Sequence, residues 1–98
     1  MSAAALVPLD LTVLVPLVTG GGSGIGLGLV EDFLKRGSPK VLITGRRLDP
    51  LKKVAKTYPG KVFFLQSDAG SGKDREALLK WVKKEHPDCN ALINNAGV

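Results

Sequence analysis

The sequence predicts an α/β protein built on a parallel sheet, and three observations support this prediction. Short apolar runs alternate along the chain with segments of helical periodicity, which gives the order βαβαβαβ. The apolar runs show no polar alternation, as is typical of strands covered on both faces. A glycine-rich segment directly follows the first run. Because crossovers between parallel strands are right-handed, these features favour a partial Rossmann fold, a doubly wound parallel sheet with strand order 3-2-1-4.

Four apolar runs are expected to form the strands, at residues 13–19, 41–44, 62–65 and 91–94. Pro16 lies inside the first of them. Proline has no N–H to donate and is unusual in a central strand, so this strand must begin after Pro16 or be distorted there. The length of 98 residues fits one domain. We expect residues 1–98 to form it, with residues 1–11 as a poorly defined N-terminal extension.

Local start and stop signals mark the three helices between these strands. Gly37 is expected to stop the first helix, because glycine readily adopts the left-handed conformation that follows a helix end. Asp49 is expected to be the N-cap of the second helix, with Pro50 at its first position. Ser71 is expected to cap the third helix, and Asp74 three residues later resembles a weakened capping box.

The glycine-rich segment at 19–26 lies between the first strand and the first helix. Gly20 is expected to permit the sharp turn, Gly24 to let a diphosphate approach the backbone, and Gly26 to allow close packing of helix on strand. The N–H groups and the dipole at the start of a helix favour a phosphate there. The alternative is a flexible glycine loop with no ligand. The predicted binding residues of this loop are Gly20, Ser23, Gly24, Ile25 and Gly26.

Two motifs resemble those of the short-chain dehydrogenase/reductase family. Thr19-Gly20-x-x-x-Gly24-Ile25-Gly26 is similar to its cofactor motif, and Asn94-Asn95-Ala96-Gly97 to its second motif. Their order and spacing also resemble the family, from about Thr12 onward. The resemblance implies hydride transfer between a nicotinamide cofactor and an alcohol or carbonyl substrate. It also implies that Asn94, Ala96 and Gly97 line the ribose side of the cofactor, the alternative being an ordinary Asn-rich turn.

Arg46 and Arg47 follow the second strand, where a Rossmann site for NAD usually carries an acid that accepts from the ribose 2′-hydroxyl. Gly45 supplies no such acid, and the guanidinium of Arg46 can donate a planar fork of hydrogen bonds to a 2′-phosphate. The pattern resembles the NADP-preferring members of the family, so NADP is expected rather than NAD. Arg47 either assists or points to solvent. By the same resemblance Asp68 contacts the adenine ring, or else it caps amides of its own turn.

No catalytic residue is predicted. Members of the family use a Ser and a Tyr-x-x-x-Lys pair, which the resemblance places well after the second motif. The one tyrosine, Tyr58, has Lys61 three residues on and Val62 four on, and it stands in a turn. We therefore expect a truncated NAD(P)-binding portion of such an oxidoreductase, not catalytic by itself. The alternatives are a noncatalytic nucleotide-sensing module that binds a partner, and a truncated product with no independent function.

The composition limits the expected partners and location. The net charge of +5 could attract nucleic acid or a membrane surface. However, the lysines of the chain fall on the predicted solvent faces of helices, without interleaved aromatic residues. Neither partner is therefore expected. No apolar run reaches the roughly 20 residues of a membrane span. Cys89 and His86 cannot form a metal cluster, and a lone thiol suits a reducing compartment, the cytoplasm. The bare apolar edge of the fourth strand is expected to allow self-association or pairing with a C-terminal half.

Overall fold

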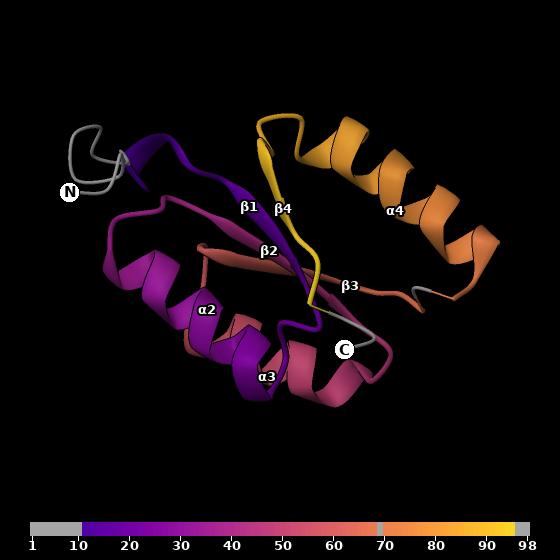
Figure 1. Ribbon diagram of the computed structural model, residues 1–98, viewed down its shortest axis with the longest axis horizontal. Helices are drawn as coiled ribbons and strands as arrows, with labels where there is room; N and C mark the ends of the chain where they lie inside the picture. Colours follow the sequence, from indigo (N-terminus) through magenta and orange to yellow (C-terminus); the bar gives the residue numbers. More distant parts are fainter. Residues whose placement is uncertain (1–10, 69, 96–98) are drawn as a thin grey trace, which may run out of the picture.

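The centre of the computed structural model, which describes residues 11–68 and 70–95, is a parallel sheet of four strands (Figure 1). All the strand pairs are parallel, and the strand order is β3-β2-β1-β4. The α/β class, the partial Rossmann fold and the order 3-2-1-4 are therefore confirmed. The strands are β1 (Pro16–Thr19), β2 (Val41–Gly45), β3 (Val62–Gln66) and β4 (Ala91–Ile93).

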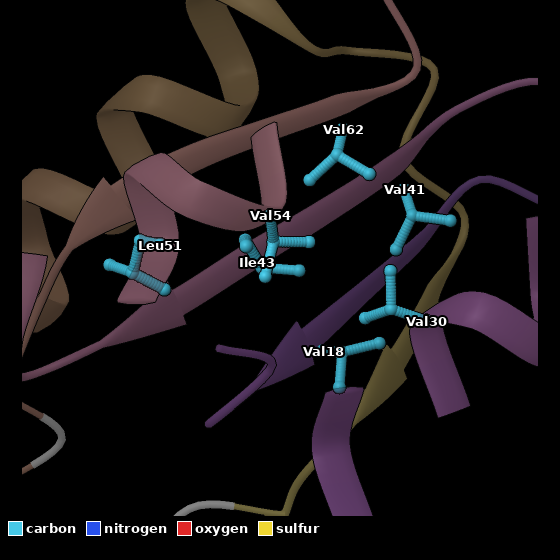
Figure 2. Packing of buried hydrophobic residues seen from close by; sticks show 7 residues of the cluster. All are labelled: Val18, Val30, Val41, Ile43, Leu51, Val54 and Val62. Carbon is cyan, nitrogen blue, oxygen red and sulfur yellow. The ribbon is translucent and has the colours of Figure 1, made fainter. Parts of the chain in front are cut away.

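Helices cover both faces of this sheet (Figure 1). Helices α2 (Gly24–Lys35) and α3 (Leu48–Thr57) lie on one face, and α4 (Gly72–Glu85) lies on the other. Figure 2 shows the main core, which lies between the sheet and helices α2 and α3. Except for Leu51 its residues are the β-branched valine and isoleucine, which suit packed strands. No residue of α4 is fully buried, so that helix covers its face only loosely. The core residues are Val18, Val30, Val41, Ile43, Leu51, Val54 and Val62.

The first strand is shorter than predicted. Val13 ends a short 3-10 turn, η1 (Leu11–Val13), and β1 begins at Pro16, a position where the missing N–H is tolerated. The side chain of Asn90 pairs with the backbone just before the proline. Its Oδ1 accepts from the N–H of Val15 at 2.9 Å, and its Nδ2 donates to the carbonyl of Val13 at 2.7 Å. Asn90 thus extends the pairing of β1 with β4 across the proline.

The helix ends follow the predicted signals in two cases. Gly37, at φ 110°, follows α2, and its N–H donates to the Leu34 carbonyl while that of Ser38 donates to Phe33. This pair of bonds is the Schellman arrangement, which needs a left-handed residue. Ser71 caps α4 by accepting from the N–H of Asp74 at 3.3 Å. Both predicted stop and start residues are therefore confirmed.

Two predicted helix-start details are wrong. Helix α3 begins at Leu48, with the extended residue Arg47 rather than Asp49 as its N-cap, so Pro50 stands third in the helix. The physical reason is that no N–H in the first turn has an intrahelical partner, so proline is tolerated anywhere in it. At α4 the carboxylate of Asp74 accepts from the N–H of Asp68 at 2.7 Å, so it does not complete a capping box.

Candidate cofactor-binding site

The predicted site residues that the structure describes all follow the carboxyl ends of strands. Because the strands are parallel, these ends meet at one edge of the sheet. The glycine loop follows β1, the two arginines follow β2, Asp68 follows β3 and Asn94 follows β4. In open α/β sheets this edge is where ligands bind. Ala96 and Gly97 of the predicted site lie outside the described residues.

The glycine loop makes its turn against the end of β2. The N–H groups of Gly20 and Gly21 both donate to the Thr44 carbonyl, at 2.7 and 3.2 Å. Gly20 has φ 69°, a left-handed conformation that side chains disfavour, and this explains why glycine stands at the turn. Gly24 has φ 58°, and a Cβ placed on it would meet nothing within 4 Å. The backbone at Gly24 therefore faces open space, as the approach of a diphosphate requires.

Two glycines of the loop are needed for close packing. A Cβ on Gly26 would overlap the carbonyl oxygen of Gly20 and lie 2.8 Å from Nδ2 of Asn95. The predicted packing role of Gly26 agrees with this geometry. Gly21 was given no role by the sequence, yet a Cβ there would lie 2.6 Å from Cγ2 of Ile43. In the sequence, the one signal for this contact is the run of three consecutive glycines at 20–22.

The start of α2 carries uncompensated positive charge. Its N-cap Ser23 is extended and makes no side-chain capping bond, and the first turn contains no acidic residue. The first N–H groups of a helix have no intrahelical partners, and the helix dipole adds partial positive charge at that end. Ser23 and Gly24 are exposed, and the apolar side chain of Ile25 is 76% exposed beside them. A diphosphate group fits the donors, the charge and the space at this helix start.

The hydroxyl of Thr19 joins the glycine loop to the segment after β4. Its Oγ1 accepts from the N–H of Asn95 at 2.8 Å, and it lies within donating distance of the Ile93 carbonyl (3.4 Å) and Asn94 Oδ1 (3.2 Å). Nδ2 of Asn95 donates to the Gly20 carbonyl at 3.4 Å. Sequence reasoning chose Asn94 for the site and passed over Asn95, although Asn95 belongs to the same motif and its side chain donates to the Gly20 carbonyl of the loop.

Arg46 and Arg47 lie in the two-residue connection between β2 and α3, and both are exposed. Within residues 11–68 and 70–95, neither guanidinium forms a hydrogen bond or an ion pair. The two side chains are not equivalent. That of Arg47 lines a groove of about 470 Å³ between α2 and α3, together with Gly22 and Asp49. Both guanidinium groups are available to an anionic ligand at the edge of the sheet.

Asp68 has a local structural role. Its Oδ1 accepts from the N–H of Gly70 at 2.9 Å, and its carbonyl accepts from the N–H of Ser71 at 2.9 Å. Asp68 therefore stabilises its own turn through its carboxylate and its carbonyl. This agrees with the alternative stated for the sequence, in which Asp68 caps amides of its turn. The adenine contact of Asp68 stays a prediction.

Other titratable groups lie away from this edge. Tyr58 is the C-cap of α3, and its hydroxyl donates to Glu31 Oε2 at 2.9 Å, which raises the pKa of Tyr58. A tyrosine acting as an acid or base at neutral pH needs the opposite shift. His86 is buried between the rings of Phe63 and Trp81, and burial first, then Lys40, lowers its pKa.

The described residues contain neither a metal-binding cluster nor a membrane-spanning helix. No group of three or more His, Cys, Asp or Glu side chains is placed to hold a metal ion within residues 11–68 and 70–95. In the same part of the chain, no helix has the length and apolar character needed to cross a membrane. The lysines expected on solvent faces are all exposed, namely Lys52, Lys53, Lys56, Lys80, Lys83 and Lys84.

Comparison with known sequences relates most of the chain to one protein family. Residues 14–98 match the family model of the short chain dehydrogenases. The chain is 40% identical over 82 residues to the uncharacterized oxidoreductase DltE of Bacillus subtilis, a match that covers 84% of this chain and 32% of that protein. It is 36% identical over 86 residues to the NADP-dependent (R)-specific alcohol dehydrogenase of Lentilactobacillus kefiri, with coverages of 86% and 34%. The chain thus spans about a third of the length of these relatives.

Solved structures agree with the sequence comparison. A short chain dehydrogenase from Bacillus anthracis superposes with a TM-score of 0.79 at 29% identity, covering 91% of this chain and 38% of that one. A short-chain dehydrogenase from Streptomyces avermitilis gives a TM-score of 0.78 at 30% identity, covering 86% and 31%. The family model covers the glycine loop, both arginines and the segment after β4. On this evidence the chain belongs to the short-chain dehydrogenase family.

Proposed function

We propose that this chain binds NADP and forms, as one domain over residues 1–98, the cofactor-binding portion of a short-chain dehydrogenase/reductase-type oxidoreductase. The observation that carries the proposal is the start of α2, at the carboxyl edge of the sheet, where N–H groups without intrahelical partners and a positive helix end lie beside the open space at Gly24. The family uses nicotinamide dinucleotides, and one relative is named as NADP-dependent. A cytoplasmic location belongs to the same proposal and is supported by the free thiol of Cys89.

Each part of the nucleotide would bind to the residues that follow one strand. The loop after β1 would hold the diphosphate, the residues after β2 the 2′-phosphate, those after β3 the adenine and those after β4 the ribose. When bound, the cofactor supplies a hydride donor or acceptor, and this chain binds and orients it. The residues we assign are Gly20, Ser23, Gly24, Ile25 and Gly26 for the diphosphate, Arg46 and Arg47 for the 2′-phosphate, Asp68 for the adenine, and Asn94, Ala96 and Gly97 for the ribose.

The choice of NADP over NAD rests on the end of β2. Gly45 offers no carboxylate to repel a 2′-phosphate, and the guanidinium groups of Arg46 and Arg47 form no ion pair with described residues. An unpaired guanidinium is a planar donor that matches phosphate oxygens. The full reaction, hydride transfer between NADP(H) and an alcohol or carbonyl, is proposed for the oxidoreductase of which this chain supplies the cofactor half. The 98 residues hold no Tyr-x-x-x-Lys pair, so we expect no turnover from them alone.

Titration calorimetry of the 98-residue chain with NADP and NAD tests the proposal. We expect NADP to bind more tightly, and Arg46→Ala to weaken NADP by about tenfold or more, because a hydrogen bond to a charged group contributes about 1.5–3 kcal/mol. Arg36→Ala is the matched control, since it removes an exposed arginine at the far end of α2. The proposal fails if the wild-type chain binds neither nucleotide. Equal affinities for the two would remove the role of Arg46.

A second candidate function is pairing with another chain along β4, by itself or in response to the nucleotide. The observation that favours it is Leu92, which is 63% exposed in a strand that pairs, in the described sheet, with β1 alone. An exposed apolar strand edge is a template for strand addition. A second copy of this chain or a C-terminal half would each satisfy it.

A further inference from the structure

The connection between β2 and α3 carries both arginines of the proposed 2′-phosphate site on only two residues. Strand β2 ends at Gly45 and α3 begins at Leu48. An exposed arginine has many rotamers, and ordering it on binding costs free energy. The backbone beneath Arg46 therefore decides how much of that cost remains, because it sets the direction in which the side chain leaves the chain.

Gln66, the last residue of β3, holds this connection. It lies opposite Gly45 in the register of β2 and β3. Its side-chain Nε2 donates to the backbone carbonyl of Arg46 at 2.9 Å. One residue further on, the N–H of Ser67 donates to the Gly45 carbonyl at 2.8 Å. The two carbonyls on either side of Arg46 Cα are thus both bonded to the end of β3.

These bonds fix the backbone of Arg46 on both sides. A peptide unit is planar and trans, so a bond to the Arg46 carbonyl fixes the plane that it shares with the N–H of Arg47. The bond from Ser67 holds the preceding peptide plane in the same way. With both planes held, the Cα–Cβ direction of Arg46 is set before any ligand arrives. Gln66 is the one side chain in this arrangement, since the other bond is made by backbone atoms.

We infer that Gln66 is a specificity-positioning residue, which acts through the Arg46 backbone to direct that guanidinium to the 2′-phosphate. The inference rests on the proposed function, because it concerns the same site. Its contribution applies to a nucleotide with a 2′-phosphate and not to NAD, which carries a 2′-hydroxyl at that position. A side chain that merely stabilised the fold would affect both nucleotides alike.

The test is a double-mutant cycle between Gln66→Met and Arg46→Ala in the 98-residue chain, read by calorimetry with NADP and with NAD. Methionine keeps the size of glutamine and removes the amide donor. We expect Gln66→Met to weaken NADP by about three- to tenfold, which corresponds to one neutral hydrogen bond, and to leave NAD unchanged. In the Arg46→Ala background the same change should have no effect on NADP.

Thr57→Val is the matched control for this cycle. It also removes a side-chain donor to a backbone carbonyl, the 2.8 Å bond to Lys53, but at the far end of α3. Equal weakening of NADP and NAD by Gln66→Met, or a full loss in the Arg46→Ala background, would overturn the inference. The inference would also be overturned if Gln66→Met bound NADP as tightly as the wild-type chain while Arg46→Ala bound it more weakly. In each of these cases the proposed function stands, whereas a wild-type chain that binds neither nucleotide defeats both.

Discussion

Two glycines of helix α2 differ in the space available for a side chain. A Cβ on Gly26 would overlap the carbonyl oxygen of Gly20, which is backbone and cannot rotate away. Two residues further along the same helix, a Cβ on Gly28 would meet nothing within 4 Å. The same substitution is therefore expected to have opposite effects at these two positions.

We expect Gly26→Ala to lower the free energy of unfolding by roughly 1–3 kcal/mol, because the helix must move away from the loop. Gly28→Ala should raise it by about 0.5–1 kcal/mol, because alanine has the better helix propensity. Urea denaturation followed by circular dichroism measures both values. Gly26→Ala should also lose NADP binding while Gly28→Ala retains it. Equal stabilities of the two variants would contradict the packing geometry.

Which residues carry the site was only partly predictable. The glycine loop, Arg46 and Arg47 follow strand ends that the apolar runs mark clearly, so their shared edge could be inferred. Asn95 and Gln66 were not chosen, because their importance comes from the partners that strand register gives them, the Gly20 and Arg46 carbonyls. A single sequence does not contain that register. The bonds from these side chains to backbone carbonyls are visible only in the structure.

At the scale of elements, the start of β1 depends on a residue that is distant in the sequence. The apolar residues of 13–19 form one run in the sequence, yet strand β1 begins only at Pro16. Asn90 bonds the backbone there across 75 and 77 sequence positions, so no local pattern reveals it. The start of α3 was misplaced for another reason, since proline is tolerated at any position of a first helical turn. The other strands were predicted to within one residue.

Asn90→Ala tests whether this side chain sets the start of β1. It leaves the N–H of the buried Val15 and the carbonyl of Val13 without their side-chain partners. We expect the free energy of unfolding to fall by about 1–3 kcal/mol, the cost of leaving the N–H of a buried residue such as Val15 unsatisfied. Thr57→Ala, which removes an exposed bond within α3, should cost less. If both variants lost the same stability, the bonds of Asn90 would not be what holds the strand start.

At the scale of the whole molecule, apolar surface is left uncovered where β4 and α4 lie. Leu92 of β4 is 63% exposed and Leu79 of α4 is 59% exposed. No residue of α4 is buried. This surface supports the proposed pairing along β4.

We expect the wild-type chain to elute as a species larger than a monomer in size-exclusion chromatography with light scattering. Leu92→Lys should shift it toward the monomer, because a charged side chain blocks strand addition at an edge. Val13→Lys is the control, since Val13 is similarly exposed, at 64%, but lies before β1. A wild-type chain that stays monomeric at every concentration, with and without NADP, would exclude pairing between two copies.

The hydroxyl of Thr19 ties the loop after β1 to the N–H of Asn95, 76 positions later in the chain. During synthesis the glycines are made first, and Thr19 precedes its anchor by 76 positions. A nascent chain that has reached β3 already carries every glycine of the loop, but not the partner of that hydroxyl. Nucleotide capture should therefore begin only after translation has passed residue 95, because contacts of such sequence separation form late.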